Sequence, residues 1–169
     1  LELRNCVIKD SSGPTDGFAL WAEDGETVLR GCEVKNNSNY QPSIAQSGPL
    51  YFGGTRAEVI NCNIHGNSGY FLYGCGITAR CDLTVRNTSI RNNIGKFGDQ
   101  KYLDPAMDGA SGGIMFGDAD GSLVIEDSTI SGNMVAVGTG GGVSVRAAAT
   151  ATVRDSRITH NYALGSGGL

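Results

Sequence analysis

The chain has 169 residues, and its 13 basic and 17 acidic residues give a net charge of −4. This length fits one domain with its own core, and the shortage of basic residues excludes a protein that binds the nucleic-acid backbone. Apolar residues make up 40% of the chain, which excludes a disordered acidic tail, and no stretch approaches the ~20 apolar residues of a membrane span. Glycine, with 26 residues, is about twice as frequent as usual, and the composition predicts an all-β domain.

Six segments of the chain share one pattern, beginning with residues 1–11. In that first segment residues 1–4 alternate as a short strand does, Asn5 predicts a tight bend, and residues 6–10 predict a second strand. Each later segment repeats this order and ends on Ile or Val followed three residues later by Asn. Such self-similarity is typical of repeat architectures. The later segments cover residues 27–37, 57–67, 83–93, 123–133 and 151–161.

The fifth position of every repeat holds a residue type that tolerates a left-handed backbone. We therefore expect two strands to meet there at a sharp bend. The next position is always small, as expected for a side chain that points inward just past the bend. The two columns are Asn5, Gly31, Asn61, Asn87, Asp127 and Asp155, followed by Cys6, Cys32, Cys62, Thr88, Ser128 and Ser156.

A third short strand is predicted before each following repeat, most clearly at Gly112-Gly113-Ile114 and Gly141-Gly142-Val143. Three short strands separated by turns make one triangular coil of a β-solenoid. The repeat spacing varies from 26 residues, between Leu3 and Leu29, to 40 residues, between Val85 and Ile125. This variation excludes a propeller with its nearly constant blade length and predicts one variable corner, whose longest loop insertion covers residues 94–110.

Coils that stack about 4.8 Å apart place identical side chains above one another. The Ile and Val columns then form a continuous core, and the terminal Asn column forms a ladder of hydrogen-bonded side-chain amides. The predicted ladder consists of Asn37, Asn67, Asn93, Asn133 and Asn161, with Ser11 in the first coil.

With these columns the chain resembles right-handed parallel β-helix proteins of the pectin-lyase-like superfamily. Within that fold it is most similar to the polymorphic outer-membrane protein repeat, through Gly141-Gly142-Val143 and Ile130-Ser-Gly-Asn133. It departs from that repeat by using Ile in place of Phe and by lacking the Gly pair in the first coils. The resemblance implies an all-β, right-handed parallel β-helix of about six coils with three short strands each. It implies no single activity, because this fold hosts lyases, hydrolases, epimerases, adhesins and passive stalks.

Both termini interrupt the pattern, since Leu1 begins within a coil and Leu169 ends within a Gly-Gly strand. Solenoids need polar capping repeats, and none is visible. We therefore expect residues 1–169 to be a single β-helix segment that continues into further coils of a longer protein. The resemblance favours an extracellular or cell-surface location, and the segment itself opens at Leu1-Glu2-Leu3 without the basic-then-apolar pattern of a leader.

The cysteines fall into two groups. Cys6, Cys32 and Cys62 share one inward column and are predicted to be small buried apolar residues. Cys75 and Cys81 lie outside that column. In an oxidising compartment, a local disulfide between them is one alternative, and two separate thiols are the other.

Asp118-Ala-Asp120-Gly121 is a short version of the opening of a calcium loop. It lacks the further oxygen ligands and the closing Glu of an EF-hand. A Ca²⁺ site at Asp118 and Asp120 is therefore one interpretation, and an ordinary Asp-Gly turn is the other. No other cofactor is indicated.

The outward face of the third strand is important because the polysaccharide-active proteins that this chain resembles use that face. Trp21 and Tyr51 on neighbouring coils are candidates for stacking against sugar rings, or else they cover the sheet beneath the loops. Arg80 and Arg146 are candidates for binding the carboxylate of an acidic sugar. The face has no pair of carboxylates such as a glycosidase needs, and no residue is assigned a catalytic role. His65 belongs to another outward column, with Lys9, Lys35 and Arg91, which is interpreted as a solvated polar face.

These observations favour a non-catalytic β-helix scaffold, an adhesin-like passenger of a cell-surface or secreted protein. The alternative is part of a polysaccharide-active β-helix, a lyase, epimerase or hydrolase, that binds a polysaccharide or cell-surface glycan. A third interpretation is a surface-layer module stabilised by Ca²⁺.

Overall fold

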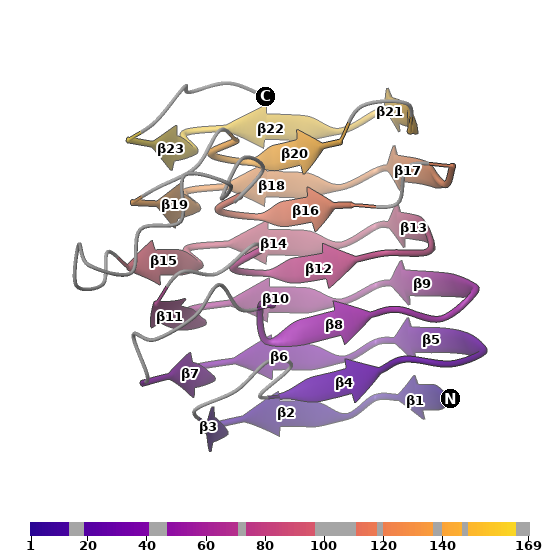
Figure 1. Ribbon diagram of the computed structural model, residues 1–169, viewed down its shortest axis with the longest axis horizontal. Helices are drawn as coiled ribbons and strands as arrows, with labels where there is room; N and C mark the ends of the chain where they lie inside the picture. The colour runs from indigo at the N-terminus through magenta and orange to yellow at the C-terminus, as the bar shows by residue number, and fades with distance from the viewer. Residues whose placement is uncertain are drawn as a thin grey trace.

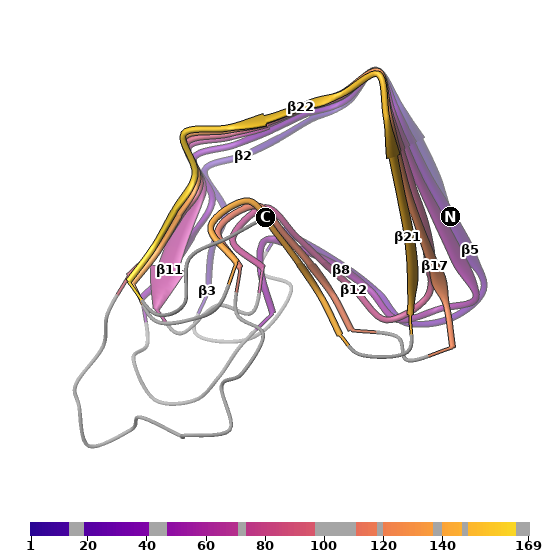
Figure 2. The same ribbon diagram turned by 90° about the horizontal axis from the view of Figure 1, so that it is seen from above.

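The computed structural model describes residues 1–13, 19–40, 47–70, 74–96, 111–117, 120–136, 140–146 and 149–164. These residues form short strands and turns only, and the strands stack into four parallel sheets along one axis (Figure 1). The predicted all-β parallel solenoid is therefore confirmed. Viewed down the axis, equivalent strands of successive coils superimpose (Figure 2).

Two six-stranded sheets contain the strands on either side of the predicted bend. Sheet A holds the strands before it: β1 (Glu2–Arg4), β5 (Glu26–Arg30), β9 (Arg56–Ile60), β13 (Asp82–Arg86), β17 (Ser122–Glu126) and β21 (Thr150–Arg154). Sheet B holds the strands after it: β2 (Val7–Lys9), β6 (Glu33–Lys35), β10 (Asn63–His65), β14 (Ser89–Arg91), β18 (Thr129–Ser131) and β22 (Arg157–Thr159).

The remaining two sheets flank the variable corner. Sheet C holds β3 (Ser12–Gly13), β7 (Ser38–Asn39), β11 (Ser68–Tyr70), β15 (Ile94–Lys96), β19 (Met134–Val135) and β23 (Tyr162–Ala163). Sheet D corresponds to the predicted third strand and holds β4 (Leu20–Ala22), β8 (Leu50–Phe52), β12 (Ile77–Ala79), β16 (Ile114–Phe116) and β20 (Val143–Val145).

The coil therefore has four strands rather than the three predicted. Sheet C was missed because its strands are two or three residues long and carry Ser, Gly and Asn in the first coils, without apolar alternation. Its strand β15 also takes the first three residues of the predicted insertion 94–110. The rest of that insertion, 97–110, lies outside the described residues.

Left-handed residues form two corners of each coil. All six residues of the predicted bend column have positive φ, between 47° at Asn87 and 66° at Gly31, so this expectation is confirmed. A second left-handed column, between sheets B and C, was not predicted. It consists of Asp10, Asn36, Gly66, Asn92, Gly132 and His160.

The core runs through the coils as stacked columns, as expected. Val34, Ile64, Ile90 and Ile130 in sheet B are fully buried, and their strands pair in register. Sheets A and D supply the opposing side chains, among them Leu29, Val59, Val85, Ile125, Leu50, Phe52, Ile77, Ile114 and Phe116. The described residues contain no helix with the length and apolar character needed to cross a bilayer.

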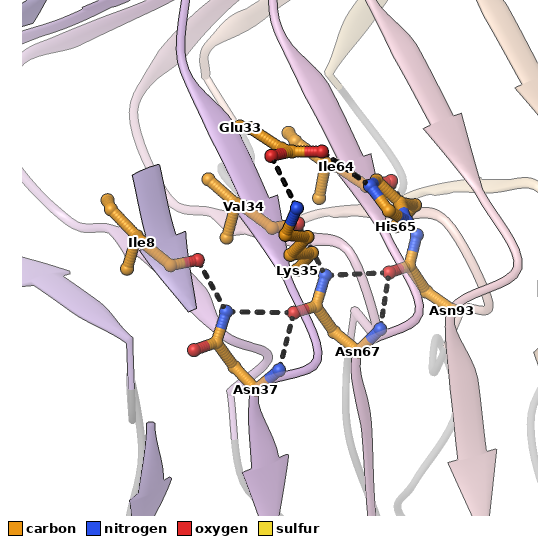
Figure 3. Close-up of polar contacts among 9 residues, drawn as sticks. All are labelled: Ile8, Glu33, Val34, Lys35, Asn37, Ile64, His65, Asn67 and Asn93. Atoms are coloured by element: carbon orange, nitrogen blue, oxygen red, sulfur yellow. Dashed lines mark hydrogen bonds and ion pairs between the residues drawn. The ribbon is translucent and has the colours of Figure 1, made fainter. Parts of the chain in front are cut away.

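The predicted Asn ladder is present and follows sheet B. Each side-chain amide donates to the Oδ1 of the next Asn at 2.9 Å, from Asn37 through Asn161. The same amide also donates to a main-chain carbonyl one coil back, such as Ile8 for Asn37 at 3.1 Å (Figure 3). In the first coil Ser11 donates its backbone N–H to Asn37 Oδ1 at 3.0 Å. The ladder thus supplies partners to buried backbone N–H and carbonyl groups near the corner between sheets B and C.

Candidate functional site

The outward face of sheet D has the register expected from the sequence. Trp21, Tyr51, Thr78, Met115 and Ser144 pair across neighbouring strands in a single column. Sequence reasoning therefore placed these side chains on the correct face of the correct strand.

Trp21 and Tyr51 stack on each other. Their ring centroids are 4.0 Å apart with an interplanar angle of 17°, and Trp21 Nε1 donates to Glu23 Oε2 at 3.0 Å. The indole is 42% exposed, whereas Tyr51 is only 6% exposed. Of the two predicted sugar-stacking residues, only Trp21 has a substantially exposed ring, and the buried Tyr51 ring stacks against one face of the indole.

The middle of this column is buried. Thr78 Oγ1 accepts a hydrogen bond from the Gly48 N–H at 3.0 Å, and Met115 is 1% exposed. The ring of Tyr51 folds over Gly53, where a Cβ would lie 2.8 Å from Tyr51 Cε1. Between β8 and β16 the outward side chains are therefore buried, which agrees with the alternative that these residues cover the sheet.

Arg80 and Arg146 follow β12 and β20 and are exposed. Each donates its backbone N–H one coil back, Arg80 to the Phe52 carbonyl at 2.7 Å and Arg146 to the Phe116 carbonyl at 3.0 Å. They therefore occupy equivalent places two coils apart, about 10 Å along the axis, with Gly117 in the coil between them. Both residues therefore directly follow strands of sheet D, in coils that are not neighbours.

A second polar cluster lies on the outward face of sheet B, where sequence reasoning predicted only a solvated surface (Figure 3). Glu33 Oε2 accepts from Lys35 Nζ at 2.7 Å, and Glu33 Oε1 lies 3.1 Å from His65 Nε2. The Lys35 ammonium and, second, the His65 ring hold the pKa of the Glu33 carboxyl below its usual value. The carboxylate was missed because sequence reasoning followed only the column of His65, and Glu33 lies in the next one.

Glu33 is expected to titrate below an ordinary glutamate. Because its folded pKa is lowered, its interactions stabilise the protein above the usual Glu pKa and are lost as the pH falls through the lowered value. Replacing Lys35 by Met should raise the Glu33 pKa, measured from the carboxyl carbon shift by NMR. Lys96→Met, which changes a lysine over the Tyr70 ring on sheet C, is the matched control. An unchanged Glu33 midpoint in Lys35→Met would contradict the assignment of Lys35 as the main cause.

A groove of about 460 Å³ runs along the corner between sheets A and B. Its residues come from successive coils and are mainly amide, hydroxyl and carboxylate side chains, among them Glu33, Asn63 and Ser89. Asn87 Nδ2 donates to Asn61 Oδ1 at 2.9 Å along one wall. Sequence reasoning predicted the bend but not the groove, because the lining comes from four successive coils.

The calcium prediction stays untested. Asp118 lies outside the described residues, and Asp120 is an exposed residue beside a turn. At the same corner Asp82 Oδ1 accepts from the Ser122 N–H at 2.8 Å and from its hydroxyl at 3.1 Å, which is a turn-stabilising role. Within the described ranges, no three His, Cys, Asp or Glu side chains gather closely enough to hold a metal ion.

The inward cysteine column forms part of a second ladder. The N–H of Cys32 donates to Cys62 Sγ at 3.4 Å, and the N–H of Cys62 donates to Thr88 Oγ1 at 3.1 Å. Thr88 and Ser128 continue the pattern, with the Thr88 N–H donating to Ser128 Oγ at 3.1 Å. Cys, Thr and Ser are therefore alternatives at this position because each accepts one hydrogen bond from the preceding coil.

Cys75 and Cys81 are not joined in a disulfide, so the pairing that the sequence left open is not formed. The strand β12 separates the two residues, and their sulfur atoms face different carbonyls, Met134 at 3.8 Å and Phe52 at 3.7 Å. Burial raises the pKa of the Cys75 thiol and keeps it protonated.

The four in-register parallel sheets and the Asn ladder define a β-solenoid, and a family model described as a right handed beta helix region matches residues 1–168. The chain belongs to the right-handed β-helix family. No curated protein and no solved structure is significantly similar to this β-helix. The finer likeness to the polymorphic outer-membrane protein repeat stays a prediction. On this β-helix the candidate sites lie on two faces, the outward side of sheet D and the corner between sheets A and B.

Proposed function

We propose that this β-helix is a non-catalytic, rigid scaffold within a cell-surface or secreted protein, and that it displays the loops of its variable corner. The observation that carries the proposal is the pair of unbroken side-chain ladders. The Asn ladder links five coils through buried amides, and the Cys/Thr/Ser ladder links the same coils on the other side of sheet B.

Ladders of this kind favour stiffness. A coil cannot move relative to its neighbour without breaking hydrogen bonds of fully buried groups such as Asn67, Asn93 and Asn133. Each buried polar group left without a partner costs about 1–3 kcal/mol, and the costs accumulate along a stack in which every coil contacts only its neighbours. A chain built in this way suits a passive rod.

The sheet D column supports the non-catalytic interpretation. Its outward side chains are two stacked aromatics, a threonine, a methionine and a serine. None of these side chains carries a carboxylate or an imidazole for proton transfer near neutral pH. Its three central members are buried, so a polymer lying along this face would not reach them.

The test is incubation of the folded protein, with and without Ca²⁺, with plant, algal and bacterial polysaccharides, followed by mass spectrometry of released oligosaccharides. A scaffold is expected to release none. Slow hydrogen exchange at the backbone amides of Asn67, Asn93 and Asn133 is the accompanying positive result. Shortened or unsaturated products would overturn the proposal in favour of a polysaccharide-active β-helix.

A second candidate function, glycan binding without catalysis, is favoured by the geometry of Trp21. One ring face rests on Tyr51 and the edge is held by Glu23, so the exposed indole is already ordered for stacking against a sugar ring. Arg80 and Arg146 directly follow strands of the same sheet and are exposed, and they would attract an acidic glycan.

Under this second function, Trp21→Ala is expected to weaken glycan binding about 5- to 30-fold, measured by affinity electrophoresis in gels that contain acidic or neutral polysaccharides. Removing the stacking surface costs on the order of 1–2 kcal/mol of binding. The matched control is Tyr40→Ala, because Tyr40 is also an exposed aromatic, at 61%, but follows sheet C. Equal retention of both variants and the unaltered protein would count against glycan binding by Trp21.

A further inference from the structure

We infer that the thiols of Cys32 and Cys62 together bind one soft divalent metal ion of the mercury(II) type, with one sulfur atom on each side of the ion. The two cysteines occupy equivalent positions of neighbouring coils. The strands before them pair in register, as do the strands after them, where Glu33 lies opposite Asn63. Both belong to the core of the solenoid, away from the outward face of sheet D, and the inference does not rest on the proposed scaffold role.

The two thiols point in the same direction. Each donates to the carbonyl two residues earlier, at 3.6 Å for Cys32 and 3.2 Å for Cys62. Each also lies 3.5 Å from a carbonyl of the preceding coil, which belongs to Leu3 for Cys32 and to Leu29 for Cys62. Because both side chains make the same contacts, their sulfur atoms are separated by about the coil spacing, roughly 4.8 Å.

This separation suits a metal ion that takes two ligands in a straight line. A bond between a metal and a thiolate is about 2.3 Å long, so a linear pair of such bonds spans about 4.6 Å. Mercury(II) accepts linear coordination and, as a soft ion, prefers thiolate ligands. Zinc needs four ligands in a tetrahedron, whereas in the part of the chain that the structure describes no three His, Cys, Asp or Glu side chains gather around one point.

The charge balance favours a divalent ion. On binding, each thiol releases its proton to the solvent, and the two thiolates neutralise the two charges of the ion. A neutral unit suits an enclosed position, where a monovalent ion would leave one uncompensated negative charge. Burial raises the pKa of the Cys62 thiol, so this thiol stays protonated until the ion displaces the proton. Binding should therefore tighten as the pH rises.

The corner groove leads toward the two thiols. Cys32 and Cys62 are among its lining residues, together with the carboxylates of Glu33 and Asp127, and no lysine or arginine is found among the described residues of the lining. Carboxylates at the mouth raise the local concentration of cations. The cysteines are only 2% and 4% exposed, so an ion enters during a brief local opening of one coil.

A disulfide between the same two thiols fits less well. The Cβ atoms of stacked residues are about 4.8 Å apart, whereas a disulfide needs roughly 3.5–4.5 Å. Shortening this distance would draw two coils together while the strands on both sides of the cysteines stay paired in register. The spacing therefore favours an inserted ion over a direct bond.

The experiment is native mass spectrometry of the reduced, folded protein after addition of mercury(II) chloride and then of excess glutathione. One ion per chain is expected to remain, because two thiols held at the right distance compete better than separate thiols. Cys32→Ser should lower the retained fraction at least tenfold. Serine preserves the ladder, since Ser128 occupies the same position two coils beyond Cys62 and accepts from the Thr88 N–H.

Two control variants locate the ion. Cys81→Ser should retain it, because Cys81 lies outside the column and its sulfur faces the Phe52 carbonyl. Cys6→Ser should also retain it, although Cys6 belongs to the same column, whereas Cys62→Ser should lose it.

Four outcomes would overturn the inference. The first is that the unaltered protein retains no mercury, and the second is equal retention by Cys32→Ser when circular dichroism shows that it is folded. The third is loss in Cys6→Ser with retention in Cys62→Ser, which would place the ion between the first two coils. The fourth is retention of zinc in place of mercury. None of these outcomes bears on the polysaccharide-release test of the scaffold.

Discussion

Replacement of Asn93 by Ala is expected to lower the free energy of unfolding by about 4 kcal/mol. The Oδ1 of Asn93 accepts from the Asn67 N–H at 3.1 Å and from Asn67 Nδ2 at 2.9 Å, and its amide donates to the Ile64 carbonyl at 3.1 Å. The amide also donates to Asn133 Oδ1 at 2.9 Å, so the substitution removes four hydrogen bonds at a fully buried position. Each buried polar group that is left unsatisfied costs about 1–3 kcal/mol. Urea unfolding monitored by circular dichroism measures the change.

The neighbouring residue provides the control for the Asn93 prediction. Asn92 is exposed and has a φ of 54°, and the same column contains Gly66 and Gly132. Asn92→Gly should therefore cost less than about 1 kcal/mol, since glycine adopts a left-handed backbone without strain. A loss below about 1 kcal/mol in Asn93→Ala would show that the ladder contributes little to stability and would weaken the proposed scaffold.

Gly113→Val is expected to lower the free energy of unfolding by about 3 kcal/mol or more. A Cβ at this position would overlap the Gly142 carbonyl oxygen and would lie 2.9 Å from Ile130 Cγ2 and 3.3 Å from Asn133 Nδ2. The first obstacle is backbone of the next coil and cannot rotate away, so the coils must separate locally. For a chain of this size, the melting temperature should fall by about 6–12 °C.

Gly25 is the matched glycine for this comparison. It has a φ of 68°, and a Cβ there would meet nothing within 4 Å. Gly25→Asn should change the melting temperature by less than about 2 °C, because asparagine tolerates the left-handed backbone. If Gly113→Val melted within the same range, the close approach of coils at the Gly-Gly strand would not be a packing constraint.

The candidate sites were only partly predictable. The column of Trp21, Tyr51, Thr78, Met115 and Ser144 followed from alternation, because side chains two residues apart share a face. The burial of Tyr51 and Met115 did not follow, since it depends on Gly53 and Gly117, over which these side chains fold. The contacts of Glu33 and the lining of the corner groove depend on neighbours in other coils.

The sequence by itself determined the repeat, the left-handed bend, the core columns and the Asn ladder. Each of these features recurs at one position in every coil, so a local preference is repeated until it becomes a pattern. Only the tertiary structure decided that a coil has four strands, that Cys75 and Cys81 stay apart, and which polar side chains meet. Those features arise from contacts between coils 26 to 40 residues apart, where distance in space is set by stacking and not by position along the chain.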